Sequence, residues 1–268
     1  MTAHDGDHQV PDQLADFDKR LITLRCKQKP VFVAGSGPAV IVMAEMPGIT
    51  PLVARFARWV RDAGFKVYMP NLFGEAGRPG GSHLYFASSL AKICISREFH
   101  LLCSRSSGPI ADWLRELAKL AHRESGGKGV GAVGMCITGN FALSMMLEPA
   151  MLAPVLSQPS LPFLPASALH IAPDELQDVK ERLDREDLTV RGYRFENDKF
   201  CKKERFAAYR EALGDRFIGD ETLRNSDANP AAGGNPHSVL TEHLIDKDGS
   251  KTREKRDEVL AFLRMRLQ

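Results

Sequence analysis

One cysteine in the chain lies in a context that suits nucleophilic chemistry. Cys136 stands between the apolar run 130–135 and the stretch 141–150, which is expected to be helical, and Gly134 and Gly139 flank it. A nucleophile at a sharp strand-to-helix turn needs small residues nearby, and the amino end of the next helix favours a thiolate. The competing interpretation is a small buried core residue, the ordinary role of a cysteine. The local stretch leaves both open.

The turn around this cysteine departs from the usual pattern at one position. A nucleophile elbow ordinarily has a small residue two positions after the nucleophile, whereas here Thr138 stands there and Gly139 follows. Threonine is compatible with the turn if its φ stays negative. The chain has no GxSxG, no Walker loop, no HExxH and no complete GxGxxG, so the cysteine turn is the remaining catalytic motif.

A cysteine nucleophile needs a base, and the base needs a carboxylate that orients it. In α/β-hydrolases these residues follow in the order nucleophile, acid, histidine. Asp198 comes just after the predicted strand 188–195, and His237 lies in a loop before the predicted last helix, with His243 as a competitor. Taken singly, Asp198 could be a turn or capping residue and His237 an exposed loop histidine. Their order and their element types together favour a Cys-Asp-His triad.

The elements that must position these residues alternate along the chain. Apolar runs predict buried strands at 39–44, 65–70, 130–135, 166–171 and 188–195, and amphipathic or capped stretches predict helices at 51–64, 84–103, 109–125, 141–150, 202–214 and 252–267. This alternation predicts an α/β fold with a mostly parallel central sheet and helices on both faces. Residues 215–250 are loop-rich, and loops at the carboxyl edge of such a sheet are where sites are built.

Composition argues against several classes of protein. The 268 residues carry a formal net charge of +2, so no overall field recruits nucleic acid or an anionic membrane, and no apolar run reaches the roughly 18 residues of a membrane span. The polar, acidic amino terminus does not resemble a secretory signal. Five scattered cysteines (Cys26, Cys94, Cys103, Cys136 and Cys201) form no CxxC pair and no metal-finger spacing. We expect a cytoplasmic protein with reduced thiols, no metal and no cofactor; the oligomeric state stays open.

Taken together, these stretches resemble the dienelactone hydrolase family, from about residue 25 to 268. "AVIVMAEMPGITPLVARFARWVRDAGFKVYMPNLFG" resembles the first central strand, glutamate-bearing loop, helix and next strand of that family; "GAVGMCITG" resembles its cysteine elbow, "ENDKFCKKERF" its acid segment and "PHSVLT" its histidine segment. The resemblance implies an α/β-hydrolase fold, with a flexible tail over 1–18 and a single domain over 19–268. It also implies hydrolysis of a lactone or an activated carboxylic ester through a thioester intermediate.

The resemblance also implies roles for particular residues. It implies a triad of Cys136, Asp198 and His237, a hydrogen bond from Glu45 to the resting thiol, an oxyanion hole made by the backbone N–H groups of Met46 and Ile137, and a substrate-carboxylate contact from Arg97. Where the family has a second carboxylate-binding arginine, this chain has Thr241. The alternative hypotheses are a protein that binds a small molecule on this fold without turning it over and, more weakly, a redox-sensing thiol.

Overall fold

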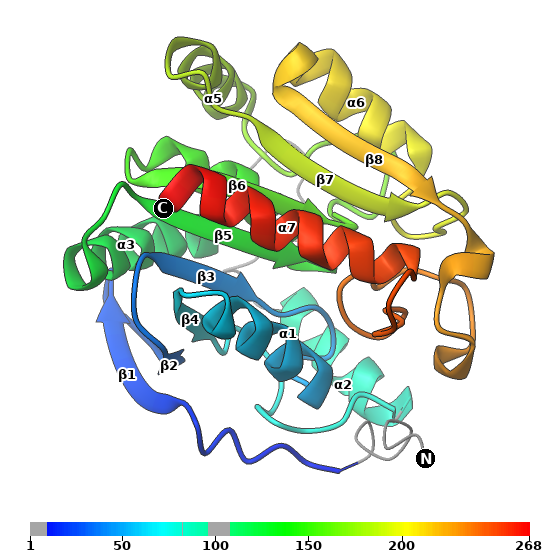
Figure 1. The fold of residues 1–268 in the computed structure, drawn as a ribbon. Helices are drawn as coiled ribbons and strands as arrows, with labels where there is room; N and C mark the ends of the chain where they lie inside the picture. Colours follow the sequence, from blue (N-terminus) through cyan, green and yellow to red (C-terminus); the bar gives the residue numbers. More distant parts are fainter. Residues whose placement is uncertain (1–9, 82, 96–107) are drawn as a thin grey trace.

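A computed structural model describes residues 10–81, 83–95 and 108–268, and their strands form one sheet (Figure 1). The strands are β1 (Asp18–Leu24), β2 (Lys27–Ala34), β3 (Ala39–Met43), β4 (Lys66–Pro70), β5 (Val130–Met135), β6 (Met151–Ser157), β7 (Val190–Phe195) and β8 (Phe217–Leu223). Their order across the sheet is β1-β2-β4-β3-β5-β6-β7-β8. The pairings β1–β2 and β2–β4 are antiparallel and the rest are parallel, as expected for a mostly parallel α/β sheet.

Helices cover both faces of this sheet. The helices are α1 (Pro51–Asp62), α2 (His83–Ile95), α3 (Gly108–Ser125), α4 (Gly139–Ser144), α5 (Pro173–Arg185), α6 (Lys203–Leu213) and α7 (Lys251–Leu267). α1 and α7 pack on one face, in front of the sheet in Figure 1, and α3 to α6 pack on the other. The predicted α/β fold with helices on both faces is confirmed.

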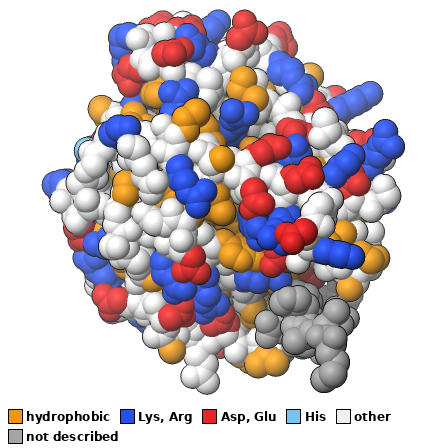
Figure 2. Space-filling model, viewed as in Figure 1, with side chains coloured by type: hydrophobic (Ala, Val, Ile, Leu, Met, Phe, Trp, Pro, Cys, Tyr) orange, Lys and Arg blue, Asp and Glu red, His pale blue; other side chains and the backbone are white. Residues whose placement is uncertain are grey.

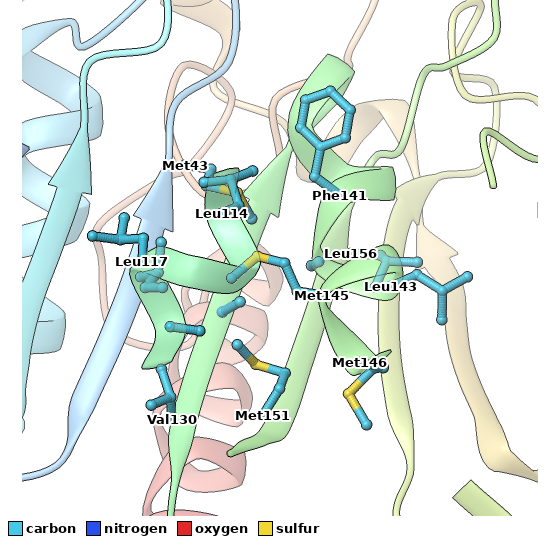
Figure 3. Packing of buried hydrophobic residues seen from close by; sticks show 14 of the residues in the cluster. Met43, Leu114, Leu117, Val130, Phe141, Leu143, Met145, Met146, Met151 and Leu156 are labelled. Carbon is cyan, nitrogen blue, oxygen red and sulfur yellow. The ribbon is translucent and has the colours of Figure 1, made fainter. Parts of the chain in front are cut away.

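The sheet centre is buried on both sides because its strands are apolar throughout. Every residue of β3 and β5 is buried. Figure 3 shows the core beside α3 and α4, which is rich in methionine; the labelled residues are Met43, Leu114, Leu117, Val130, Phe141, Leu143, Met145, Met146, Met151 and Leu156. On the opposite face, a Cβ on Gly131 would lie 2.6 Å from a side-chain carbon of Leu263, so this glycine lets α7 lie close to β5.

Helix α1 shows how local sequence sets an element. The Thr50 hydroxyl accepts from the Val53 N–H, Pro51 occupies the first turn, and Gly64, with φ +95°, follows the last turn. Its apolar stripe packs on the sheet, while Arg58 on the outer side pairs with Asp12 and Asp16.

The residues just before β1 also pack on this helix layer. Leu14 and Phe17 are buried in the same core as α1, although the sequence predicted a flexible tail through residue 18. Two apolar side chains and the aspartates that meet Arg58 fix this segment. Residues 1–9 of the predicted tail lie outside the described residues.

Several predicted elements differ from the structure. The predicted strand 166–171 is wrong, because these residues form turns, and the predicted helix 141–150 ends early in the short α4 and a 3-10 turn. β1, β2, β6, β8 and α5 had no sequence prediction. The sequence did not predict β6 because it contains Pro154, and proline is unusual in a central strand. In the structure, β6 pairs with β7 only from Val155 onward, so Pro154 lies before the part of the strand that pairs on both sides.

The carboxyl ends of β3, β5, β6 and β7 meet at one edge of the sheet, where sites form in this fold class.

The face over α1 and α7 shows basic and acidic side chains interspersed rather than gathered by sign (Figure 2). Across the described ranges, no helix combines the length and the apolar character that a membrane crossing requires.

Candidate active site

Cys136 lies at the sharp turn that the sequence predicted. β5 ends at Met135, and Cys136 has φ +54°, a conformation that non-glycine residues seldom adopt outside strained turns. A 3-10 turn (Cys136–Thr138) leads directly into α4. A Cβ on Gly134 would lie 2.3 Å from the Thr138 carbonyl oxygen, so the turn closes only with glycine at that position.

Thr138 explains how the turn tolerates a larger residue. Its φ is −88°, in the region expected for threonine, and its side chain is fully buried. The hydroxyl accepts from the Met135 N–H at 2.9 Å and lies 3.1 Å from the carbonyl oxygens of Met43 and Ala44. The same side chain therefore closes the cysteine turn and ties it to the end of β3.

Asp198 and His237 meet as the sequence predicted. His237 Nδ1 lies 2.7 Å from Asp198 Oδ2, so Nδ1 carries the proton that is donated and Nε2 is left for proton transfer. Asp198 Oδ1 accepts from the N–H groups of Phe200 and Cys201 at 2.8 and 2.9 Å. The carboxylate is thus a turn residue and a histidine partner at once. His237 Nε2 is buried, and the Cys136 side chain acts on the ionisation of this imidazole.

His243 stabilises the backbone around His237 by hydrogen bonds and does not replace it in the site. Its Nδ1 accepts from the N–H groups of Ser238 and His237 at 3.2 and 3.4 Å, and its Nε2 donates to the Gly233 carbonyl at 3.3 Å. Only a neutral imidazole can accept and donate in this way. Burial lowers the pKa of His243, which favours that neutral form.

Glu45 follows β3 and is buried beside the cysteine turn. Gln158 Nε2 donates to its Oε2 at 2.9 Å, and the Thr241 hydroxyl donates to its Oε1. Within the described part of the chain, no hydrogen bond joins this carboxylate to Cys136, so the contact that the family resemblance implied is replaced by bonds to Gln158 and Thr241. The position of the family's second arginine therefore supplies a neutral donor.

Gln158 had no sequence prediction, because the strand that precedes it was missed. It is fully buried, with φ +37°, and its Oε1 accepts from the Val239 N–H at 3.2 Å and from the Ser157 hydroxyl. The apolar run 151–157 ending in two polar residues was the available signal. Gln158 joins the loop after β3 to the loop that carries the histidine.

Burial and charge set the ionisation of the site. Burial alone lowers the pKa of His237, but negative charge on Cys136 and the hydrogen-bonded Asp198 carboxylate outweigh it and hold the pKa well above its ordinary value. Burial raises the pKa of Glu45, and the hydrogen bond from Thr241 and the nearby His237 offset only part of this effect. The site therefore favours the positively charged form of the His237 imidazole.

A pocket of about 170 Å³ opens over these residues. It is lined by Glu45, Met46, Phe86, Leu90, Cys136, Ile137, Ser160, Phe163, Phe200, His237 and Ser238. Met46 and Ile137, the predicted oxyanion-hole residues, thus border the same space as the cysteine and the histidine. Arg97, the predicted substrate contact, lies outside the described residues.

Comparisons with known proteins identify the family and the fold of the chain. A family model described as "Dienelactone hydrolase family" matches residues 27–213 of the 268. No curated protein matches the chain in sequence.

Solved structures resemble it in fold. A putative dienelactone hydrolase from Klebsiella pneumoniae subsp. pneumoniae MGH 78578 is 15% identical, with a TM-score of 0.59 over 92% of this chain and 98% of that one. A dienelactone hydrolase from Anabaena variabilis ATCC 29413 is 14% identical, with a TM-score of 0.55 over 94% and 100%. The dienelactone hydrolase-like promiscuous phosphotriesterase P91 from metagenomic libraries is 17% identical, with a TM-score of 0.58 over 94% and 100%. Because the family model matches well over half of its length, this chain belongs to the dienelactone hydrolase family and is a hydrolase that acts on ester bonds.

Proposed function

We propose that this protein hydrolyses a lactone or another activated carboxylic ester through a Cys136-His237-Asp198 triad and a thioester intermediate. The strongest support is one juxtaposition: a cysteine with φ +54° at the end of β5 and an imidazole held 2.7 Å from a buried carboxylate border the same pocket. Nucleophile, base and orienting acid are the parts that such catalysis requires.

In the first half-reaction, the Cys136 thiolate attacks the ester carbonyl carbon. A C–S bond forms and the carbonyl electrons move to oxygen, where the backbone N–H groups of Met46 and Ile137 stabilise the oxyanion. Collapse of this intermediate breaks the C–O bond. The leaving oxygen takes a proton from the His237 imidazolium, and an acyl thioester remains on Cys136.

In the second half-reaction, His237 Nε2 removes a proton from water, which attacks the thioester carbonyl. The C–S bond breaks, the acid leaves and the thiolate returns. Asp198 holds the Nδ1–H tautomer throughout and stabilises the imidazolium. Glu45, whose carboxylate is held by Gln158 and Thr241, adds negative potential that favours the positive imidazole next to the thiolate.

The decisive test replaces the nucleophile. Cys136→Ala should reduce kcat/KM for lactones and aryl esters by about a thousandfold or more, while Cys26→Ala, which removes an exposed thiol, should leave it unchanged. A wild-type rate in the Cys136→Ala protein would exclude the triad. If neither protein turned over any ester, yet the Cys136 thiol bound such compounds, the alternative of a non-catalytic binding protein would stand.

We further propose that residues 19–268 act as one domain, since every described strand joins a single sheet. We place the protein in the cytoplasm, where a reducing environment keeps the Cys136 thiol available. Recovery of unmodified Cys136 from cells, measured by differential alkylation, tests this placement; a fully oxidised thiol would contradict it.

A further inference from the structure

The walls of the active-site pocket are apolar on most sides. Five segments contribute large apolar side chains: Met46 after β3, Phe86 and Leu90 from α2, Ile137 from the cysteine turn, Phe163 from the loop after β6, and Phe200 from the turn after β7. The polar groups gather at the catalytic end, around Glu45, Cys136 and His237. Among the described residues, no lysine or arginine lines the pocket.

From this lining we propose that the enzyme selects esters whose acyl group is uncharged and apolar, the size of one six-membered ring or a chain of about four to six carbons. The proposal rests on the proposed esterase function and specifies its substrate class. This lining disfavours a substrate that carries a carboxylate on its acyl group; a preference for such a substrate would instead favour the expected contact from Arg97.

The floor of the pocket disfavours a negative charge on the acyl group. Glu45 is held there by two uncharged donors, Gln158 and Thr241, and no lysine or arginine of the described residues lines the pocket beside it. The His237 imidazole is already held by Asp198. A carboxylate on the acyl group would lose its water in this space, and the imidazole already paired with Asp198 would offset only part of that cost, which is large in a low-dielectric environment.

The volume of the pocket limits the size of the acyl group. The pocket measures about 170 Å³. An apolar protein cavity of about 150 Å³ stays dry and holds a benzene molecule. One ring or a short alkyl chain therefore fills this pocket, and a longer chain must leave it through the mouth.

The mouth is itself apolar. Phe86, Phe163 and Phe200 are 42%, 40% and 58% exposed, and they come from three separate segments of the chain. Aromatic rings that converge on one opening while still exposed to water are typical of ligand-binding surfaces. A neutral acyl group gains by covering these rings, whereas a charged one would lose its hydration against them.

A matched pair of substrates tests the charge selection. 4-Nitrophenyl pentanoate and the mono-4-nitrophenyl ester of glutaric acid have acyl groups of the same chain length, and only the second ends in a carboxylate. We expect kcat/KM for the pentanoate to be at least a hundredfold higher. A ratio below about three, or a preference for the glutarate ester, would overturn the proposal while leaving the esterase function intact.

A chain-length series tests the size selection. Across 4-nitrophenyl esters from two to twelve carbons, kcat/KM should peak at four to six carbons and fall at least tenfold by ten. Phe163→Ala should flatten this peak, whereas Met265→Ala, which removes an exposed apolar side chain from α7, should not. A profile that rises steadily to twelve carbons would refute the size limit.

A reversible probe separates this inference from catalysis. Pentanal and 5-oxopentanoate each add to a thiolate: a C–S bond forms, the carbonyl oxygen takes a proton, and a hemithioacetal results. We expect pentanal to protect Cys136 from iodoacetamide at concentrations at least tenfold lower, measured by mass spectrometry of the peptide that contains it. If no ester were hydrolysed but pentanal still protected Cys136 better than 5-oxopentanoate, the proposed function would be wrong and the pocket selectivity would stand. Equal protection by the two compounds would contradict the selectivity.

Discussion

The hydroxyl of Thr138 makes a sharp prediction, because two substitutions separate its hydrogen bonds from its shape. Valine keeps the side-chain volume and removes the hydroxyl, whereas serine keeps the hydroxyl and removes one methyl group. Both substitutions leave the backbone of the turn compatible with its φ of −88°. The comparison therefore isolates the contacts between the cysteine turn and the end of β3.

The structure sets the expected magnitudes. In Thr138→Val, the Met135 N–H loses its acceptor at 2.9 Å, and the single hydroxyl proton, which the carbonyls of Met135 at 2.9 Å and of Met43 and Ala44 at 3.1 Å share, is lost. Each buried polar group left unpaired costs about 1–3 kcal/mol, so valine should cost about 2–5 kcal/mol. Thr138→Ser loses one buried methyl group, which is worth about 1 kcal/mol.

Urea unfolding followed by circular dichroism measures both variants, with the slope m checked for a common two-state transition. Activity adds a second readout. Since Thr138 ties Ile137 to the loop that carries Met46, valine should also lower kcat/KM about tenfold or more by separating the two proposed oxyanion donors. If valine unfolded within 0.5 kcal/mol of wild type, or if serine were the less stable variant, the hydroxyl would not hold the turn as described.

Four further substitutions test other parts of the site. Asp198→Asn should lower kcat/KM roughly 10³–10⁴-fold with a folded protein, because the imidazole loses its tautomer control; near wild-type kinetics would remove Asp198 from the triad. The free energy of unfolding of Glu45→Gln should rise relative to that of wild type between pH 5 and pH 8. The folded-state pKa of the Glu45 carboxyl is raised above the unfolded value of 4.5, so its ionisation opposes folding as the pH increases. Urea midpoints of the two proteins that differ by the same amount at every pH would contradict this. His243→Phe should be less stable than wild type by urea unfolding at pH 7, and this difference in stability should narrow towards pH 5. Because the folded-state pKa of His243 is lowered, its contribution to stability is present above 6.5 and is lost as the pH falls through the folded pKa. A difference that widens towards pH 5 would argue against the neutral form. Gly134→Ala should abolish soluble, active protein because its Cβ meets backbone at 2.3 Å, whereas Gly81→Ala meets no atom within 4 Å and should behave as wild type in a solubility and activity assay.

The central part of the fold could be predicted from the sequence because its signals are local. β3, β4 and β5 are short apolar runs, and α1 has its own cap and stop residues. β8 carries several partly exposed polar residues at the edge of the sheet, so its pattern resembles a loop. The pairing with β7 that makes it a strand is a long-range interaction that local sequence does not contain.

The proposed triad could be placed from chain order, since Asp198 follows a predicted strand and His237 lies in a loop before the predicted last helix. The partners of Glu45 could not. Gln158 lies 113 residues away in sequence and Thr241 lies 196 away, and neither has a local pattern that points to a carboxylate. Thr138 appeared in the sequence as an irregularity of the turn, and only its distances to β3 explain it.

The bonds of Gln158 have a consequence for how this site can change over generations. One amide contacts Glu45 on one side and the Val239 N–H on the other. A lineage that lost Glu45 would leave the buried Gln158 amide without its acceptor. A lineage that lost Gln158 would leave the buried Glu45 carboxyl without one of its donors. Positions 45, 158 and 241 should therefore be inherited as a unit, with single changes purged and only combined replacements retained.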